Sequence, residues 1–141
     1  MGPMRVLGID PGGKRLGLAV GDTTTGIATP LEVVNYGRRV DAAQKIEEFM
    51  VGHAVETVVI GLPTNVDGDE TPACRRSHAL SEALADLGIT AVLQGEYLST
   101  DEARRRARAL GRKSSLPVDD LAAQVILEEY LERHGAEGRA P

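Results

Sequence analysis

The stretch GIDPGGKRLG, residues 8–17, places a carboxylate at the end of an apolar segment and directly before a glycine-rich turn. The β-branched, apolar runs at 5–9 and 16–20 predict two strands joined by that turn. Ligand sites collect at such strand ends, and Lys14 and Arg15 add charge suited to phosphate. An ordinary hairpin whose turn begins at Asp10 explains the stretch equally well. Asp10 is therefore the first candidate functional residue, with a purely structural role as the alternative.

The segments on either side of this turn predict an α/β fold. Residues 27–34 add a third strand, so the chain begins with an antiparallel meander. Strands at 56–60 and 89–93 then alternate with helices at 40–50, 71–87, 99–110 and 118–133. The order βββαβαβαα predicts one mixed sheet with helices on both faces. We expect a single domain over residues 4–134 and a frayed C-terminal tail over 135–141.

Composition limits the setting in which the chain works. Of its 141 residues 42% are hydrophobic but only 3% are aromatic, so Val, Leu, Ile and Ala must fill the interior. The one cysteine, Cys74, excludes an intramolecular disulfide. No N-terminal apolar segment resembles a signal peptide or a membrane span. We expect a cytoplasmic protein without membrane contact.

The charge is unevenly distributed along the chain. A net charge of -5 argues against a uniformly positive surface, the usual mark of non-specific nucleic-acid binding. Six of the 16 Lys and Arg residues nevertheless lie between Arg104 and Lys113. One face could therefore attract phosphate, although a solvated helix face is the alternative interpretation.

Two further acidic positions accompany Asp10. Glu96 follows a predicted strand, and Asp119 with Asp120 opens the last predicted helix. Taken singly, Glu96 is a loop acid and the aspartates are helix caps. Taken together, carboxylates from different elements suit one or two Mg or Mn ions in phosphodiester hydrolysis. The scattered histidines and single cysteine offer no zinc site.

Several ordered motifs are spread over nearly the whole chain. They are GID at 8–10 with KRLG at 14–17, ATPL at 28–31, VIGLP at 59–63 with Asn65 and Asp67-Gly68, and VDDLAA at 118–123. Together they resemble the YqgF family of RNase H-like proteins, whose members are described as Holliday junction resolvases or as nucleases that mature precursor ribosomal RNA. The resemblance implies a five-stranded RNase H-like sheet of order 3-2-1-4-5 and a catalytic, metal-binding triad of Asp10, Glu96 and Asp119.

The chain departs from the family at one motif. The family carries DERLTT where residues 95–100 read GEYLST, so Glu96 and Thr100 are kept and Tyr97 replaces an arginine. Arg104 or Arg108 on the following helix could supply the missing cation. With that strand order, Glu96 leaves a strand two positions from that of Asp10, roughly 9 to 10 Å away. Two reserve ligands remain open: Asp67, whose 65–68 segment also resembles a turn, and Asp120.

The predicted activity is a metal-dependent nuclease, acting as an endonuclease or exonuclease on structured DNA or precursor ribosomal RNA. Phosphate contacts are expected from Lys14, Arg15, Thr100, Arg104 and Arg108. A resolvase would need a homodimer, because a junction presents two symmetric strands. Two alternatives stay open. One is a nucleic-acid or ribosome-assembly binding module without turnover. The other is a phosphate-binding domain like that of actin-like ATPases, which pair two such domains where this chain supplies one.

Overall fold

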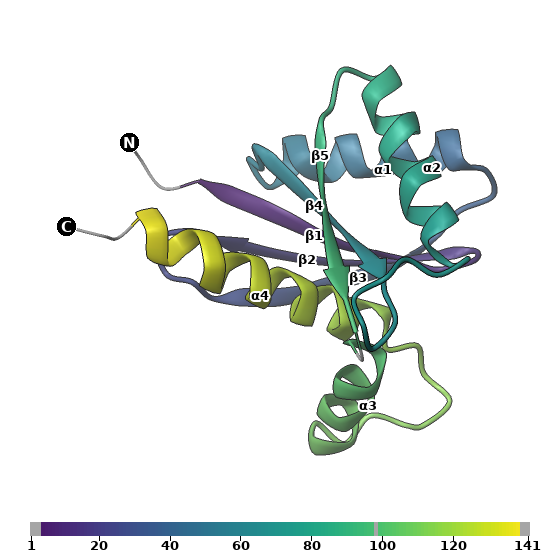
Figure 1. Ribbon diagram of the computed structural model, residues 1–141, viewed down its shortest axis with the longest axis vertical. Coiled ribbons are helices and arrows are strands. Elements are labelled where there is room, and N and C mark those ends of the chain that lie inside the picture. Colours follow the sequence, from purple (N-terminus) through teal and green to yellow (C-terminus); the bar gives the residue numbers. More distant parts are fainter. Residues whose placement is uncertain (1–3, 98, 139–141) are drawn as a thin grey trace.

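The computed structural model describes residues 4–97 and 99–138 and shows a central sheet with helices on both faces (Figure 1). Nine elements follow one another in the predicted order. The strands are β1 (Arg5–Pro11), β2 (Arg15–Asp22), β3 (Ala28–Asn35), β4 (Thr57–Pro63) and β5 (Ala91–Glu96). The helices are α1 (Arg39–Gly52), α2 (Cys74–Asp86), α3 (Ser99–Ala109) and α4 (Asp119–Gly138).

The strand order is β3-β2-β1-β4-β5, which confirms the predicted RNase H-like arrangement. The pairs β1–β2 and β2–β3 are antiparallel, whereas β1–β4 and β4–β5 are parallel. The predicted meander is therefore real, and the two later strands join it through helical crossovers. β1 occupies the middle of the sheet, so Asp10 has strands on both sides of it.

One face of the sheet packs against α1 and α2. Alternate strand residues point to this face because side chains in a strand alternate with a period of two. Ile46 of α1 and Leu84 of α2 are fully buried against them. The strand residues of this core are Leu7, Ile9, Leu16, Leu18, Val58 and Ile60.

The opposite face receives α4 alone, and glycines let the helix come unusually close. A Cβ at Gly8 would lie 2.8 Å from the Cβ of Leu127, a separation that real Cβ atoms essentially never show. A Cβ at Gly61 would collide with the Ile126 side chain, and one at Gly17 with the main chain of Asp119. The glycines of three neighbouring strands thus form the surface on which α4 lies.

Helix α3 packs on the first turns of α4 and lies beyond the end of the sheet (Figure 1). Small side chains at the contact, Ala103 and Ala107, meet Leu121 and Ala122. An ion pair of 2.6 Å between Arg106 Nη2 and Glu128 Oε1 links the two helices. Hydrophobic contact and paired charge therefore place the basic helix α3 beside the start of α4.

Element ends differ from the prediction where local hydrogen bonding decides them. β1 runs to Pro11 because Asp10 and Pro11 still pair with Gly17 and Leu16 of β2. α2 begins at Cys74, after a turn in which the Cys74 N–H donates to the Thr71 carbonyl, rather than at 71. The backbone of α4 continues to Gly138, so part of the predicted tail is helical. Residues 139–141 lie outside the described residues.

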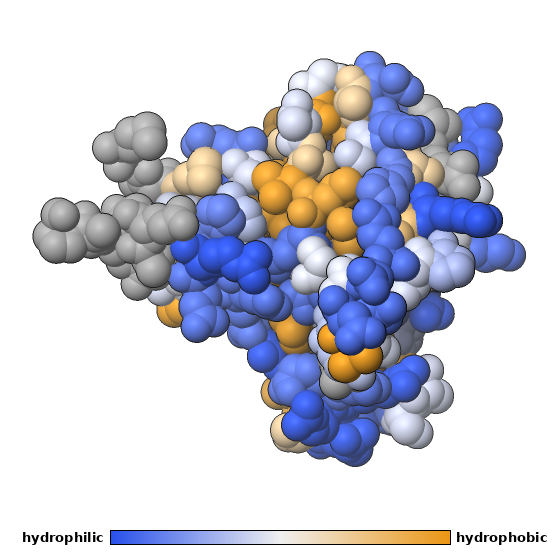
Figure 2. Space-filling model, in the orientation of Figure 1, coloured by the Kyte–Doolittle hydropathy of each residue, from blue (hydrophilic) through white to orange (hydrophobic). Residues whose placement is uncertain are grey.

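The edge of the sheet at β5 is the most apolar part of the surface in view. Figure 2 shows hydrophobic side chains gathered where β5 crosses this face. Val92 on this strand is 39% exposed.

No helix within residues 4–97 and 99–138 combines the length and the hydrophobicity needed to cross a membrane.

Candidate active site

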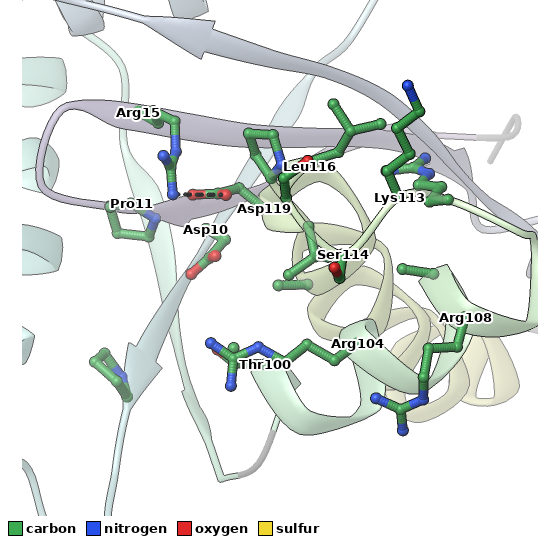
Figure 3. Close-up of a pocket in the computed structure, with 18 of the residues that line it drawn as sticks. Asp10, Pro11, Arg15, Thr100, Arg104, Arg108, Lys113, Ser114, Leu116 and Asp119 are labelled. Atoms are coloured by element: carbon green, nitrogen blue, oxygen red, sulfur yellow. Dashed lines mark ion pairs between the residues drawn. The ribbon is translucent and has the colours of Figure 1, made fainter.

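A cavity of about 520 Å³ opens where β1 and β4 end. Its walls come from the β1–β2 turn, the start of α2, helix α3, the 110–118 loop and the first residues of α4 (Figure 3). Two predicted site residues, Asp10 and Asp119, line it together. The fold thus joins carboxylates that are more than a hundred positions apart in the chain.

Asp10 reaches this cavity because it lies on the α4 face of β1, in phase with Val6 and Gly8. The pKa of Asp10 is raised from 3.8 to about 7. Burial is the largest cause, because it disfavours the charged form, and the Asp119 carboxylate adds repulsion. Arg76 on α2 acts in the opposite direction. Near neutral pH, Asp10 is therefore poised between its two protonation states.

Asp119 is the first residue of α4 and is only 9% exposed. Arg15 of β2 pairs with it, with 3.4 Å between Nη2 and Oδ1 (Figure 3). The turn leaves little room for any other side chain, since a Cβ at Gly12 would lie 3.2 Å from the second carboxylate oxygen. Glycines at 12 and 17 therefore let this carboxylate enter the cavity beside Asp10.

Glu96 ends β5 on the same face of the sheet but does not line the cavity. Its carboxylate accepts a hydrogen bond of 3.2 Å from Gln94 Nε2, which also donates to the Ile126 carbonyl of α4. The pKa of Glu96 is raised to about 8, chiefly because the residue is buried and also because of a hydrogen bond with Glu129 and the charge of that residue. Glu129 lies ten residues beyond Asp119, which is a rise of about 15 Å along the axis of α4. A contact with Glu129 therefore directs the Glu96 carboxyl group away from the Asp10–Asp119 pair.

The two reserve ligands also lie elsewhere. Asp67 is exposed in a turn in which the Asn65 Oδ1 accepts N–H bonds from Asp67 and Asp69, so the alternative turn interpretation is confirmed. Asp120 is buried, but Arg112 holds both of its carboxylate oxygens, at 3.0 and 2.9 Å. Neither side chain lines the cavity of Asp10 and Asp119.

Cations surround the acidic pair. Four predicted phosphate-binding residues line the cavity: Arg15, Thr100, Arg104 and Arg108. Arg104 extends from α3 toward the side occupied by Asp10, whereas Arg108 points away from it (Figure 3). Lys14 is exposed at the tip of the β1–β2 turn and does not line the cavity.

Three cations in the cavity wall were not among the predicted site residues: Arg76, Arg112 and Lys113. Arg112 and Lys113 belong to the basic run at 104–113, so charge clustering already indicated their region. Arg76 lies on α2, and its guanidinium would be 3.7 Å from a Cβ at Gly13. The sequence offered one signal for a site role of Arg76. It follows the GLP segment that ends β4, and the helix after a parallel strand starts at the end of the sheet where Asp10 lies.

The donor set in the cavity fits an oxygen-preferring divalent cation. Asp10 and Asp119 supply carboxylate oxygens, which Mg and Mn favour. Over the described ranges, 4–97 and 99–138, no three His, Cys, Asp or Glu side chains lie close enough to form a complete metal cluster. The geometry therefore offers two acidic ligands, and Glu96 stands apart from them.

Solved structures share the fold at low sequence identity. RuvC of T. thermophilus in complex with a Holliday junction substrate has a TM-score of 0.55 and 19% identity over 93% of this chain and 96% of that one. The Fowlpox virus resolvase in complex with Holliday junction DNA has a TM-score of 0.54 and 12% identity, covering 93% of this chain and 99% of the resolvase. At such identities these similarities establish the RNase H-like fold alone.

Sequence comparison establishes the family. A protein of Anaeromyxobacter sp. (strain Fw109-5), named "Putative pre-16S rRNA nuclease", is 40% identical over 93% of this chain and 99% of its own length. The model of the RuvX family, described as Holliday junction resolvase, matches residues 4–133. These matches confirm the resemblance read from the motifs, and the chain belongs to the RuvX family, also called YqgF.

Proposed function

We propose that this protein is a divalent-metal-dependent nuclease whose centre is the Asp10–Asp119 pair. The observation that carries the proposal is the joint position of these two carboxylates in a cavity whose other charged lining residues are all arginine or lysine. An acidic centre holds a metal, and a basic rim holds the phosphates of a nucleic acid. Membership of the RuvX family and the name of the Anaeromyxobacter relative support hydrolysis of phosphodiester bonds.

Asp10 and Asp119 are the residues that would hold Mg or Mn. When bound, such an ion would activate water and stabilise the leaving oxygen of the phosphodiester. Asp10 must then lose the proton that its raised pKa retains near neutral pH. Arg15 must share or release Asp119, with which it now pairs at 3.4 Å. Arg15 is thereby left beside the incoming phosphate, where a guanidinium binds well.

Glu96 is the proposed third carboxylate. It lies on the correct face of the sheet, but its contacts with Gln94 and Glu129 hold it away from the cavity. We infer that Glu96 joins the centre only after it leaves Glu129 and releases its proton. Loading of the centre would then depend on the ionisation of two carboxyl groups, Asp10 and Glu96.

The substrate we propose is a structured nucleic acid in the cytoplasm, either precursor ribosomal RNA or junction DNA. The name of the bacterial relative favours the former, and the family description the latter. Backbone contacts from the cationic rim would be shared by both. A junction substrate requires a homodimer, so a monomer in solution would favour precursor RNA.

A second candidate function is nucleic-acid binding without turnover. The observation in its favour is the separation of Glu96 from the Asp10–Asp119 pair, which leaves the acidic cluster incomplete. Such a module would bind RNA in a salt-sensitive manner but would be indifferent to Mg and Mn. An enzyme would bind and cleave in a manner that depends on the ion.

The deciding experiment incubates the purified chain with end-labelled precursor 16S RNA, four-way junction DNA and single-stranded oligonucleotides in Mg, Mn or EDTA. We expect cleavage of at least one substrate with Mg or Mn and none with EDTA. Asp10→Asn and Asp119→Asn should each reduce the rate by about 100-fold or more. Asp86→Asn, which removes an exposed carboxylate at the end of α2, is the control. An Asp10→Asn protein as active as the parent would refute the proposal.

A further inference from the structure

A second cavity, of about 330 Å³, lies on the other side of the β1–β2 turn. Pro11 at the end of β1 and Gly13 in the β1–β2 turn line it, together with Tyr36, which follows β3. Arg38 lines it from the N-cap of α1 and Arg76 from α2. The Asp10–Asp119 cavity is associated with α3 and α4, whereas this one is bounded by α1 and α2. The two cavities therefore flank the same turn.

The wall shared with the turn is held by a set of hydrogen bonds. The hydroxyl of Tyr36 donates to the carbonyl of Gly12 at 3.0 Å and also contacts that of Gly13 at 3.3 Å. The Tyr36 N–H donates to the Lys14 carbonyl at 3.1 Å, and the Gly12 N–H donates to the Arg15 carbonyl at 2.8 Å. Because β3 is tied to the turn in this way, the second cavity has a fixed wall.

The two cavities are adjacent and share wall residues. Pro11 and Arg76 border both of them. The guanidinium of Arg76 reaches the turn at Gly13, and its charge also acts on Asp10. A single arginine thus stands between the acidic centre and the second cavity.

The second cavity is cationic. Arg38 and Arg76 both line it. The Arg38 side chain is 78% exposed and pairs with Asp41, with 3.4 Å between Nε and Oδ2. An ion pair so exposed is weak and is easily exchanged for another anion. Helix α1 begins at the same place, and its N-cap residue Arg38 makes no side-chain capping hydrogen bond. The positive end of the helix dipole, which Asp41 in the first turn partly offsets, therefore adds to the two arginines.

We propose that the second cavity binds a backbone phosphate of the same nucleic-acid strand whose neighbouring phosphate occupies the Asp10–Asp119 cavity. The strand then passes over the β1–β2 turn, with Arg76 between the two phosphates and Arg38 at the far one. This inference rests on the proposed function, since it extends the substrate path of that site. The contact is to phosphate, so it holds RNA and DNA alike and reads no base sequence.

Binding in EDTA tests the path separately from cleavage. Fluorescence anisotropy is measured with a labelled single-stranded RNA and a DNA of the same sequence, over a range of salt concentrations. Arg38→Gln and Arg76→Gln should each weaken binding about 3- to 10-fold at low salt and reduce the salt slope by about 0.7. Each has a matched control of equal charge change: Lys45→Gln on α1 and Arg75→Gln beside Arg76 on α2. Neither residue lines either of these two cavities.

A scan of neutral methylphosphonates along the oligonucleotide locates the contact. In the parent, one position should lower the affinity, and the same substitution should have no further effect on Arg38→Gln. If no position behaves in this way, or if Arg38→Gln binds like Lys45→Gln, the inference is overturned. If the scan locates the phosphate but the protein cleaves no substrate with Mg or Mn, the proposed nuclease activity is refuted and the phosphate-binding site is retained. Agreement between the RNA and DNA arms is expected, and binding confined to one would contradict a contact made to phosphate alone.

Discussion

Gly17 of β2 lies directly beneath Asp119, and a Cβ at position 17 would overlap the main-chain carbonyl of that residue. The contact links β2, which follows the β1–β2 turn, to the first residue of α4. The helix cannot approach the sheet at this point if residue 17 carries a side chain. The position of the Asp119 carboxylate therefore depends on a glycine that has no chemistry of its own.

Gly17→Ala should both destabilise the protein and abolish its nuclease activity. The methyl group must displace main-chain atoms, so we expect a loss of about 2 to 3 kcal/mol in the free energy of unfolding, measured by urea denaturation. Gly52→Ala at the end of α1 is the control, because nothing lies within 4 Å of its Cβ. It should change stability by no more than about 0.5 kcal/mol. A Gly17→Ala protein with parental stability would show that α4 does not lie where we describe it.

Asp10 should make the parent less stable as pH rises. With a folded-state pKa of about 7 against 3.8 unfolded, the folded protein retains a proton that the unfolded chain has lost. Between pH 4 and 7 the free energy of unfolding therefore falls by at most ~1.4 kcal/mol per pH unit from this group. Asp10→Asn lacks this term, so in EDTA it should exceed the parent in stability at pH 8, with the gap closing toward pH 4. A gap independent of pH would contradict the raised pKa.

Glu129→Ala should strengthen metal binding if Glu96 is the third ligand. Removing Glu129 takes away a hydrogen bond and a charge that both raise the pKa of Glu96, so the Glu96 carboxylate ionises more readily. We expect tighter Mn binding at pH 7 by calorimetry, and weaker binding in Glu96→Gln. Glu132→Ala on the exposed side of α4 is the control. If both Glu129→Ala and Glu96→Gln bind Mn with the affinity of the parent, Glu96 is not a ligand of the metal centre.

The Arg112–Asp120 pair should fasten the 110–118 loop to α4. Both hydrogen bonds run between one guanidinium and one carboxylate, and the two side chains are 28% and 11% exposed. A double-mutant cycle with Arg112→Ala and Asp120→Ala should give a coupling energy of about 1 kcal/mol. Urea denaturation of the four proteins measures it. A coupling near zero would mean that hydrophobic packing alone positions the loop.

The strand-turn-strand unit around Asp10 could be predicted from sequence because every signal for it is local. The apolar runs, the Pro-Gly-Gly turn and the position of the carboxylate all fall within residues 5–20. The strand order was predicted from the family resemblance. That resemblance rests on whole motifs, and hydrophobic periodicity alone does not give a strand order. The pairing of Asp10 with Asp119 was likewise implied by the resemblance.

The surroundings of Glu96 could not be predicted in the same way. Gln94 shares a face of β5 with Glu96, but Glu129 comes from the middle of α4, so only the packed fold brings Glu129 to Glu96. Arg76 was missed for a related reason. An exposed arginine on an amphipathic helix resembles any solvated residue until the helix is placed beside the β1–β2 turn.

Asp10 lies on the first strand and Asp119 on the last helix, which also covers the glycine face of the sheet. During translation, Asp10 emerges from the ribosome while Asp119 is still to be added. The acidic pair can form only after α4 has been made and has packed. In the proposed nuclease, the nascent chain therefore lacks the metal-binding pair until α4 has been made and has packed on the sheet.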